Sequence, residues 1–285
     1  MSRTLVILNP TARGARSRAA YDKILHLAGD AVVQVTSSLG EARAWSENAA
    51  NEGFSTVVAA GGDGTINEVV NGIAKSKIEL GILPIGTMNV FATELGLPIG
   101  NLEHCWEIIQ ARKVRPIDLP KANGHYFVQL AGIGLDAQAV QETSSDLKRS
   151  IGPFSYLISL AQIVGRKPPG LIVKHEGGTL EGSFVIIGNG RFYGGPFDIF
   201  KNAQIDDGLL DVIVCKNMSL IDLIRYLHGG LFGTHIDLPD VDYFQARNVA
   251  VSSAEQVPVE VDGEVIGNLP VTFRFSKRKL HVLVP

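Results

Sequence analysis

The chain has 285 residues, of which 45% are apolar and 19% charged, so it can bury a sizeable core and is long enough for two domains. A formal net charge of −3 argues against binding nucleic acid through an overall basic field. Cys105 and Cys215 lie far apart without a CxxC or Cys/His cluster, which argues against a disulfide framework and fits a reducing cytoplasm. No apolar run approaches the ~20 residues of a membrane span. We therefore expect a cytoplasmic protein that at most rests on a membrane surface.

The first third of the chain alternates short β-branched runs with helical patterns, which is typical of a parallel sheet with crossover helices. This part is therefore predicted to be α/β. The expected strands are 4–8, 31–36, 55–60 and 80–84, and the expected helices are 17–27, 39–52, 65–75 and 90–95.

After about Val114 the pattern changes to short runs separated by glycine, proline and Asn/Asp turns, which predicts antiparallel strands in a β-rich second domain. Its expected strands are 126–130, 171–175, 183–187 and 210–215, and the expected strands 271–275 and 280–284 close the chain. Two helical patterns interrupt it, Ser150–Val164 and Ser219–Leu231. For both we favour packing in the core over a cap or membrane-facing role.

Three loops follow the predicted N-terminal strands, at the sheet edge where open α/β folds bind ligands. The first loop, residues 9–14, contains proline and glycine, and Arg16 and Arg18 follow it as a helix begins. Free helix N–H groups and arginine charge suit a phosphate group. An ordinary strand-to-helix loop with solvated arginines explains the same residues.

The second loop is Gly61–Thr65, with sequence GGDGT, and it leads into a helix with an apolar face. Adjacent glycines let backbone amides approach an anion, and Thr65 stands where a helix N-cap is expected. Asp63 would repel a bare phosphate but can hold a divalent cation, since Mg²⁺ usually takes one or two carboxylates plus phosphate oxygens. A type I′ turn is the alternative.

The third loop, Pro84–Asn89, again follows a strand and precedes a helix. Its Gly86 and Thr87 repeat the glycine and hydroxyl of Gly64 and Thr65. Two such loops on one sheet edge can hold the two ends of a nucleotide. The pattern is neither the P-loop GxxxxGK[ST] nor the dinucleotide GxGxxG, so neither of those mechanisms is expected.

The motifs along the chain resemble the diacylglycerol kinase catalytic domain superfamily, which includes sphingosine kinases and soluble bacterial lipid kinases. They occur in that family's order over nearly the whole chain. They are NPT (9–11), GGDGTINEVVNG (61–72), LPIGTMNVFATELGLP (83–98), AGIGLDA (131–137), NGRFYGG (189–195), AQIDDGLLDV (203–212) and VDGE (261–264).

The resemblance implies a Rossmann-like α/β nucleotide-binding domain followed by an antiparallel β-sandwich, with the active site in the cleft between them. We place the ATP-binding domain at 1–117 and the lipid-binding domain at 118–279. By the same resemblance, 280–285 can return to the first domain.

The resemblance also implies site residues. Glu264 is implied as the general base, Asp63 as a carboxylate for the catalytic Mg²⁺, and Asp118 is considered as a second one. Asp207, with the backbones of Gln204 and Leu209, is implied as a structural Mg²⁺ site, although Asp-Asp-Gly is also an ordinary turn sequence. The implied ATP contacts are Asn9, Pro10, Thr11, Ala12, Arg13, Thr36, Gly62, Asp63, Gly64, Thr65, Ile66, Asn67, Glu68 and Thr87.

Two departures from the family pattern bear on activity. The loop usually read NPxSG is NPTARG here, and Val90 stands where many relatives have an acidic residue of the Mg²⁺ network. The expected activity is phosphoryl transfer from ATP to the hydroxyl of a diacylglycerol-like or sphingoid lipid, with transient membrane-surface contact and a homodimer as one option. The alternatives are an NAD kinase-like phosphotransferase and a nucleotide-binding regulator without catalysis.

Overall fold

The computed structural model describes residues 3–12, 14–134, 168–195 and 197–285, which form two compact units. Unit 1 comprises residues 1–119 and 276–285, and unit 2 comprises residues 120–275. The sequence places the corresponding boundaries after residues 117 and 279. The predicted helical segment Ser150–Val164 and the predicted ATP contact Arg13 lie outside the described residues.

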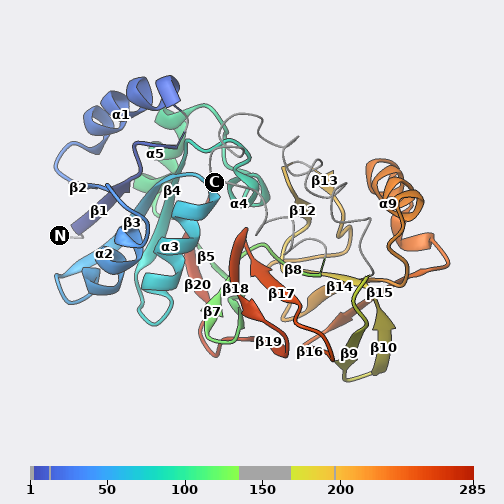
Figure 1. Cartoon of the computed structure of the whole chain (residues 1–285). Coiled ribbons are helices and arrows are strands. Elements are labelled where there is room, and N and C mark those ends of the chain that lie inside the picture. The colour runs from blue at the N-terminus through green and yellow to red at the C-terminus, as the bar shows by residue number, and fades with distance from the viewer. Residues whose placement is uncertain (1–2, 13, 135–167, 196) are drawn as a thin grey trace. The chain divides into compact units, whose positions relative to one another are not determined.

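Unit 1 is built on one six-stranded sheet (Figure 1). In spatial order its strands are β2 (Val32–Val35), β1 (Arg3–Leu8), β3 (Phe54–Gly61), β4 (Glu79–Pro84), β20 (Leu280–Leu283) and β5 (Val114–Ile117). Strands β1 to β4 pair in parallel, as predicted. Strand β20 lies parallel to β4 and antiparallel to β5, so the C-terminal strand is part of the N-terminal sheet.

Helices cover this sheet on both faces (Figure 1). They are α1 (Gly14–Ala28), α2 (Glu41–Ala49), α3 (Asp63–Ile73) and α5 (Leu102–Ala111), and the short helix α4 (Val90–Glu94) follows β4 in the chain. Helix α2 packs against α3, and α1 contacts α5. The predicted apolar face of α3 is buried, because Ile66, Val69, Val70 and Ile73 are at most 1% exposed. This burial fixes the start of α3, and therefore the glycine loop before it, against the sheet.

Unit 2 is an antiparallel β-sandwich. One sheet has the order β10 (Gly178–Gly182), β9 (Leu171–His175), β16 (Asn248–Ser253), β19 (Val271–Phe275), β6 (Pro120–Ala122) and β7 (His125–Tyr126). The other has the order β15 (Val241–Ala246), β14 (Leu210–Cys215), β11 (Phe184–Gly188), β8 (Leu130–Ile133), β17 (Pro258–Val261) and β18 (Glu264–Asn268). Alternate apolar side chains of both sheets share one buried core, which includes Val173 and Phe273 from the first sheet and Ile187 from the second. The fold class predicted from the sequence is therefore confirmed.

Among its described residues, unit 2 also contains the strand pair β12 (Phe192–Tyr193) and β13 (Phe197–Asp198), the helix α9 (Leu220–Phe232) and the 3-10 turn η1 (His235–Asp237). No helix among the described residues is both long and apolar enough to cross a bilayer.

The predicted strand 126–130 is wrong, because it is divided between β7 and β8. Residues 127–129 between them belong to no strand. The physical reason is that the amides of Val128 and Gln129 donate to the carboxylate of Asp262, at 2.8 and 3.0 Å, instead of to a neighbouring strand. A side chain that accepts hydrogen bonds from two consecutive amides interrupts the hydrogen-bond ladder between strands at that point.

The prediction that Ser219–Leu231 packs in the core is also wrong. Helix α9 forms with nearly the predicted bounds, and Ser219 caps it in a capping box with Asp222. Its apolar side chains, however, face outward: Ile221 is 77% exposed and Phe232 is 69% exposed. The spacing predicted a helix with an apolar face correctly, but spacing alone does not say which face the body of the protein covers.

Candidate functional site at the carboxyl edge of the unit 1 sheet

The register of the parallel strands brings their carboxyl ends to one edge of the unit 1 sheet. Leu8 lies beside both Val35 and Ala60, and Ala60 lies beside Leu83. The three glycine-containing loops identified in the sequence begin directly after these positions. They are therefore neighbours in space although they are far apart along the chain.

The second and third loops touch through their glycines. A Cβ atom built on Gly86 would lie 2.4 Å from the Cα of Gly62, which is closer than real Cβ atoms approach. The amide of Ile85 also donates to the carbonyl of Gly61 at 3.0 Å. Only residues without a side chain allow this approach of backbone to backbone. The two loops thus form one continuous ledge, which we call the glycine ledge (Gly61–Thr65 and Pro84–Asn89).

The first loop joins the ledge through the side chain of Asn9. Its Nδ2 donates to Oγ1 of Thr65 at 3.0 Å, while its Oδ1 accepts from the amide and the hydroxyl of Thr11. Thr65 is not the N-cap that the sequence predicts. Helix α3 begins at Asp63 with Gly62 as its N-cap, so Thr65 lies in the first turn and is buried. Its hydroxyl holds the first loop, and it does not cap the helix.

Asp63 connects the two halves of the ledge. Its Oδ1 accepts the amide of Phe91 at 3.3 Å, at the start of α4. Burial raises the pKa of the Asp63 carboxyl, while hydrogen bonds from the amides of Phe91, Val90 and Asn89 oppose that rise. This side chain therefore has a structural task, the fixing of α4, in addition to any role toward a ligand.

Asn89 is a residue whose role the sequence did not reveal. It adopts a left-handed backbone conformation with a φ of 50°, and it is 2% exposed. Its Nδ2 donates to the carbonyl of Gly86 at 3.0 Å, and its Oδ1 is buried without a partner among the described residues. A buried polar atom without a partner is costly and often marks a functional site. The only signal in the sequence is the tolerance of asparagine for positive φ.

Four of the remaining predicted ATP contacts are open to solvent. Gly64 and Thr87 are exposed on the two halves of the glycine ledge. Pro10 and Ala12 of the first loop are half-buried. These residues can reach a ligand that lies on the sheet edge.

The other predicted ATP contacts lie deeper. Thr36, Ile66 and Asn67 are buried, and the amide of Thr36 donates to the carbonyl at the end of β1. Glu68 accepts the amide of Gly40 at 3.1 Å, so it holds the segment before α2. The side chains of this set therefore support the loops from the interior of the protein.

Asp118 is also occupied. It is 4% exposed, and the ammonium group of Lys279 donates to its Oδ1. Lys279 precedes β20, so this ion pair attaches the returning C-terminal segment to the rest of unit 1. The charge of Asp118 is already compensated inside the protein.

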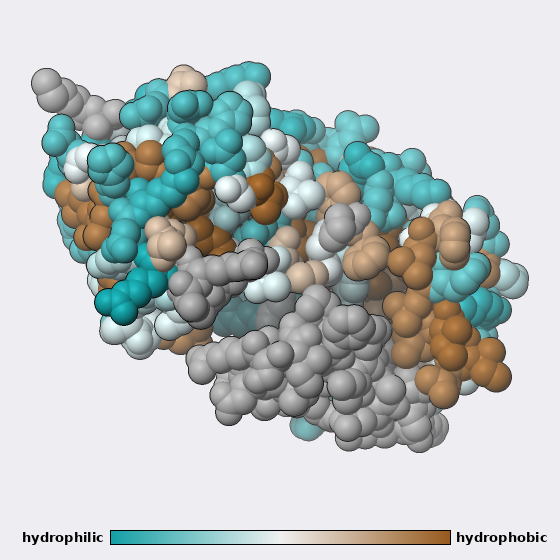
Figure 2. Space-filling view, turned by 90° about the horizontal axis from the view of Figure 1, so that it is seen from above, coloured by the Kyte–Doolittle hydropathy of each residue, from teal (hydrophilic) through white to brown (hydrophobic). Residues whose placement is uncertain are grey.

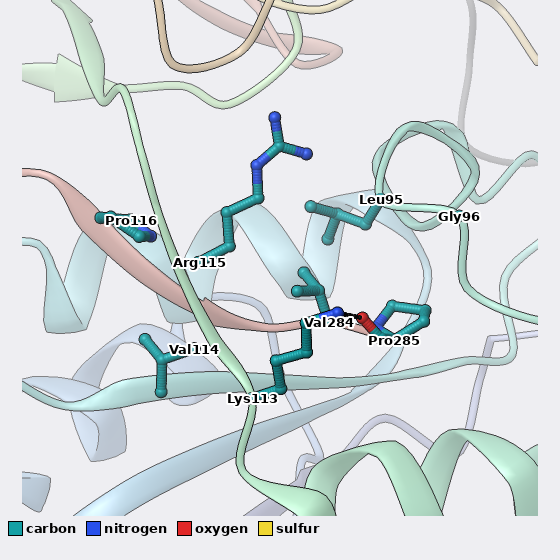
Figure 3. A pocket seen from close by; sticks show the side chains of 8 residues that line it. All are labelled: Leu95, Gly96, Lys113, Val114, Arg115, Pro116, Val284 and Pro285. Atoms are coloured by element: carbon teal, nitrogen blue, oxygen red, sulfur yellow. Dashed lines mark hydrogen bonds between the residues drawn. The ribbon is translucent and has the colours of Figure 1, made fainter.

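A pocket of about 500 Å³ lies farther along the carboxyl edge of the same sheet, where β20 ends and β5 begins (Figure 3). Lys113 and Arg115 contribute its basic side chains, and the Lys113 ammonium donates to the carbonyl of Pro285 at 2.6 Å. None of its lining residues was predicted as a site residue from the sequence. They are Leu95, Gly96, Lys113, Val114, Arg115, Pro116, Val284 and Pro285.

In unit 2, Glu264 begins β18 and is exposed. The turn before it is held by Asp262, whose carboxylate accepts the amides of residues 128, 129 and 130 at 2.8 to 3.0 Å. Glu260, which is 1% exposed, accepts the amide of Gly263 at 2.7 Å. In the sequence, Asp262 has only the pattern of a turn residue. The structure gives it a positioning role, because it fixes the hairpin that presents Glu264.

The predicted structural metal site lies in the turn before β14. The Oδ1 of Asp207 accepts the amide of Leu209 at 2.9 Å, and the amide of Asp207 donates to the carbonyl of Gln204 at 3.4 Å. Gly208 has a φ of 77°. This is the geometry of an Asx turn.

The donor sets allow a test of fit for Mg²⁺. Within the part of the chain that the structure describes, no group of three or more His, Cys, Asp or Glu side chains gathers into a metal cage. Mg²⁺ does not need one, because it usually takes one or two carboxylates together with phosphate oxygens and water. The carboxylate of Asp63, partly buried beside the glycine ledge, fits that requirement only when a phosphate is present.

The glycine ledge gives a stability prediction. We expect Gly86→Ala to destabilise unit 1 by about 1–3 kcal/mol, because the new methyl group overlaps the backbone of Gly62. Gly64→Ala is the matched control: nothing lies within 4 Å of its Cβ, and it stands inside α3. Alanine there should stabilise by about 0.5–1 kcal/mol. Urea denaturation followed by tryptophan fluorescence measures unit 1, since Trp45 and Trp106 both belong to it. Equal effects of the two substitutions would contradict the contact.

Comparison with known proteins identifies the family. The model for the diacylglycerol kinase catalytic domain matches residues 3–122, and that for the YegS C-terminal NAD kinase beta sandwich-like domain matches residues 130–284. The chain is 32% identical to a diacylglycerol kinase of Staphylococcus carnosus (strain TM300), over 99% of this chain and 95% of that protein. It is 30% identical to a diacylglycerol kinase of Bacillus subtilis (strain 168), over 100% of this chain and 97% of that protein.

Solved structures of similar fold support the same family assignment. A crystal structure described as a diacylglycerol kinase from Bacillus anthracis str. Sterne aligns with a TM-score of 0.80 and 26% identity, over 100% of this chain and 97% of that one. Another structure from the same organism aligns with a TM-score of 0.85 and 26% identity, over 100% of this chain and 95% of that one. The order of domains, the glycine loops and the full-length similarity lead to one conclusion: the chain belongs to the diacylglycerol kinase family, with a YegS-type C-terminal domain.

Proposed function

We propose that this protein is an ATP-dependent lipid kinase, which transfers the γ-phosphoryl group of ATP to the hydroxyl of a diacylglycerol-like or sphingoid lipid. The observation that carries the proposal is the contact between Gly62 and Gly86, which makes one ledge of closely approachable backbone at the carboxyl edge of a parallel sheet. Membership of a family whose relatives are named diacylglycerol kinase supports it.

In this proposal the ledge and the first loop bind the triphosphate. Backbone groups of Gly62–Thr65 and the hydroxyl of Thr87 contact phosphate oxygens, and Asn9 keeps the first loop in place. Asp63 is the carboxylate that would hold Mg²⁺ together with the phosphates. Such an ion would supply charge neutralisation for the phosphoryl group, which is the main requirement of this reaction.

The proposed chemical step needs one group that accepts a proton. Glu264 takes the proton of the lipid hydroxyl as its oxygen forms the new P–O bond, and the bond to the β-phosphate breaks to release ADP. Asp262 positions Glu264 through the three amides that it holds. We further propose that the protein works in the cytoplasm and contacts the membrane transiently, because its acceptor lies in a bilayer.

A single reaction tests this function against its alternatives. The protein is incubated with γ-labelled ATP, Mg²⁺, a total lipid extract and NAD, and the products are separated into lipid and aqueous fractions. We expect label in a lipid. Label in NADP would support an NAD kinase-like enzyme, for which the description of the C-terminal family gives some reason. Thermal stabilisation by ATP with no labelled product would support a regulator that lacks catalysis.

Asp63→Asn separates the structural from the metal role of this residue. Asparagine keeps an oxygen that can accept the amide of Phe91, so we expect the melting temperature to change little. It removes the negative charge that a hard cation requires, so phosphoryl transfer should fall by roughly 100-fold or more. Activity at the wild-type level, measured with the same lipid and ATP, would remove Asp63 from the metal role.

Glu264→Gln tests the proposed base. We expect kcat to fall by about 10²–10⁴-fold, the usual contribution of a general base, while the affinity for ATP stays unchanged. The exposed side chain makes a loss of folding unexpected. Asp262→Asn is the companion variant: it weakens the hold on the amides of 128–130, so kcat should fall without any change in ATP affinity. If ATP binding fails in either variant, the assignment of roles to unit 2 is wrong.

A further inference from the structure

Helix α9 has its polar and apolar faces reversed relative to an ordinary surface helix. In a globular protein the apolar stripe of a helix normally faces the core. Here the exposed side chains are mostly apolar, and Gly229 is the only buried residue of the helix. The exposed set is Leu220, Ile221, Ile224, Leu227, His228, Leu231 and Phe232. We call these seven side chains the α9 face.

Polar contacts hold the opposite side of the helix to unit 2. Arg225 pairs with Asp222 at 2.9 Å and also with Asp240, which is 9% exposed. The Tyr226 hydroxyl donates to Asp240 at 2.6 Å. Gly229 lies so close to His235 that an added Cβ would be 2.8 Å from its Cα. These anchors fix which side of α9 faces outward.

The outward side is a continuous apolar surface. Its members recur at positions i, i+3, i+4 and i+7, so they lie on one side of the helix. Figure 2 shows apolar surface gathered over α9. Patches of this kind on a soluble protein mark sites of protein or membrane interaction. Six large apolar side chains on one helix are far more than isolated exposure explains.

The charges around the α9 face indicate the kind of partner. The face carries no carboxylate, and its one titratable side chain is His228. Three nearby acidic groups are paired within the protein, Asp222 and Asp240 with Arg225, and Asp242 with Lys216 at 3.1 Å, while Asp237 of η1 is exposed.

Two exposed lysines complete this charge pattern. Lys216 precedes the helix, and Lys201 donates to the carbonyl of Gly233 at its end. One lysine therefore lies at each end of the apolar surface, and Lys216 also pairs with Asp242. This combination suits a partner that is apolar beneath an anionic surface.

We propose that the α9 face docks onto the surface of an anionic lipid bilayer, with its apolar side chains in the headgroup and acyl boundary and the two lysines toward the headgroups. A second copy of the chain fits less well, because symmetric pairing of this face brings lysines and His228 toward their own counterparts. The inference rests on the proposed function, because a lipid acceptor would be found in a membrane.

Co-sedimentation with vesicles tests the docking. Ile221→Glu/Ile224→Glu should weaken binding to vesicles of phosphatidylcholine and phosphatidylglycerol by roughly tenfold or more, because two large apolar side chains are lost. Glutamate near the start of a helix favours helix formation, so the fold should persist. Ile99→Glu, in unit 1, changes an isoleucine of 48% exposure and should bind as the wild type does. Ile221→Gln/Ile224→Gln removes apolar surface without adding charge, and it should also bind more weakly than wild type.

The outcomes distinguish this surface from the proposed function. Wild-type binding by the double glutamate variant, or no vesicle binding by the wild type, overturns the docking. So does a wild-type dimer that these substitutions convert to a monomer while vesicle binding is unchanged. Docking as proposed, with no labelled lipid in any assay, would leave the surface standing and overturn the kinase. A soluble short-chain diacylglycerol, supplied without vesicles, should be phosphorylated equally by wild type and variant.

Discussion

The approach of Gly62 to Gly86 is the constraint on which the candidate site depends. Two loops that are separate in the sequence meet backbone to backbone, and no side chain can stand between them. The parallel register of β3 and β4 brings their ends together, but register alone leaves room for side chains. The glycines close that distance. The result is a ledge in which the glycine peptide groups carry no side chains, which lets an anion approach backbone amides closely.

The same contact explains the unfavourable features around it. Asp63 is drawn into partial burial, and Asn89 takes a positive φ with its Oδ1 buried and unsatisfied. Each feature is unfavourable by itself. Together they hold α4 at the edge of the ledge, since Asp63 accepts the amide of Phe91. Unit 2 uses a comparable device: the buried Glu260 and the carboxylate of Asp262 fix a hairpin so that Glu264 stands exposed.

Most of the fold and part of the site can be predicted from the sequence because their signals are local. Strand and helix periodicity places β1 to β4 and α1 to α4 to within a few residues, and the letters GGDGT alone mark one half of the ledge, but α5 and β5 are not predicted. What the sequence misses depends on distant partners. Thr65 looks like an N-cap, but its hydroxyl accepts from the side chain of Asn9, 56 residues away. Residues 126–130 look like one strand, but Asp262, more than 130 residues away, takes their amides. Local pattern cannot contain such information.

Helix α9 shows the same limit in a form that bears on function. Its apolar spacing is correct, and the expectation of core packing fails because the anchors are polar: Arg225 and Tyr226 converge on the buried Asp240. A chain under selection for stability alone gains by turning the helix over and burying Ile221 and Phe232. The ion and hydrogen-bond network works against that rotation. Apolar surface kept in water by dedicated polar contacts is therefore best understood as surface that is covered in use, and the proposed lipid acceptor would bring the protein to a bilayer that can cover it.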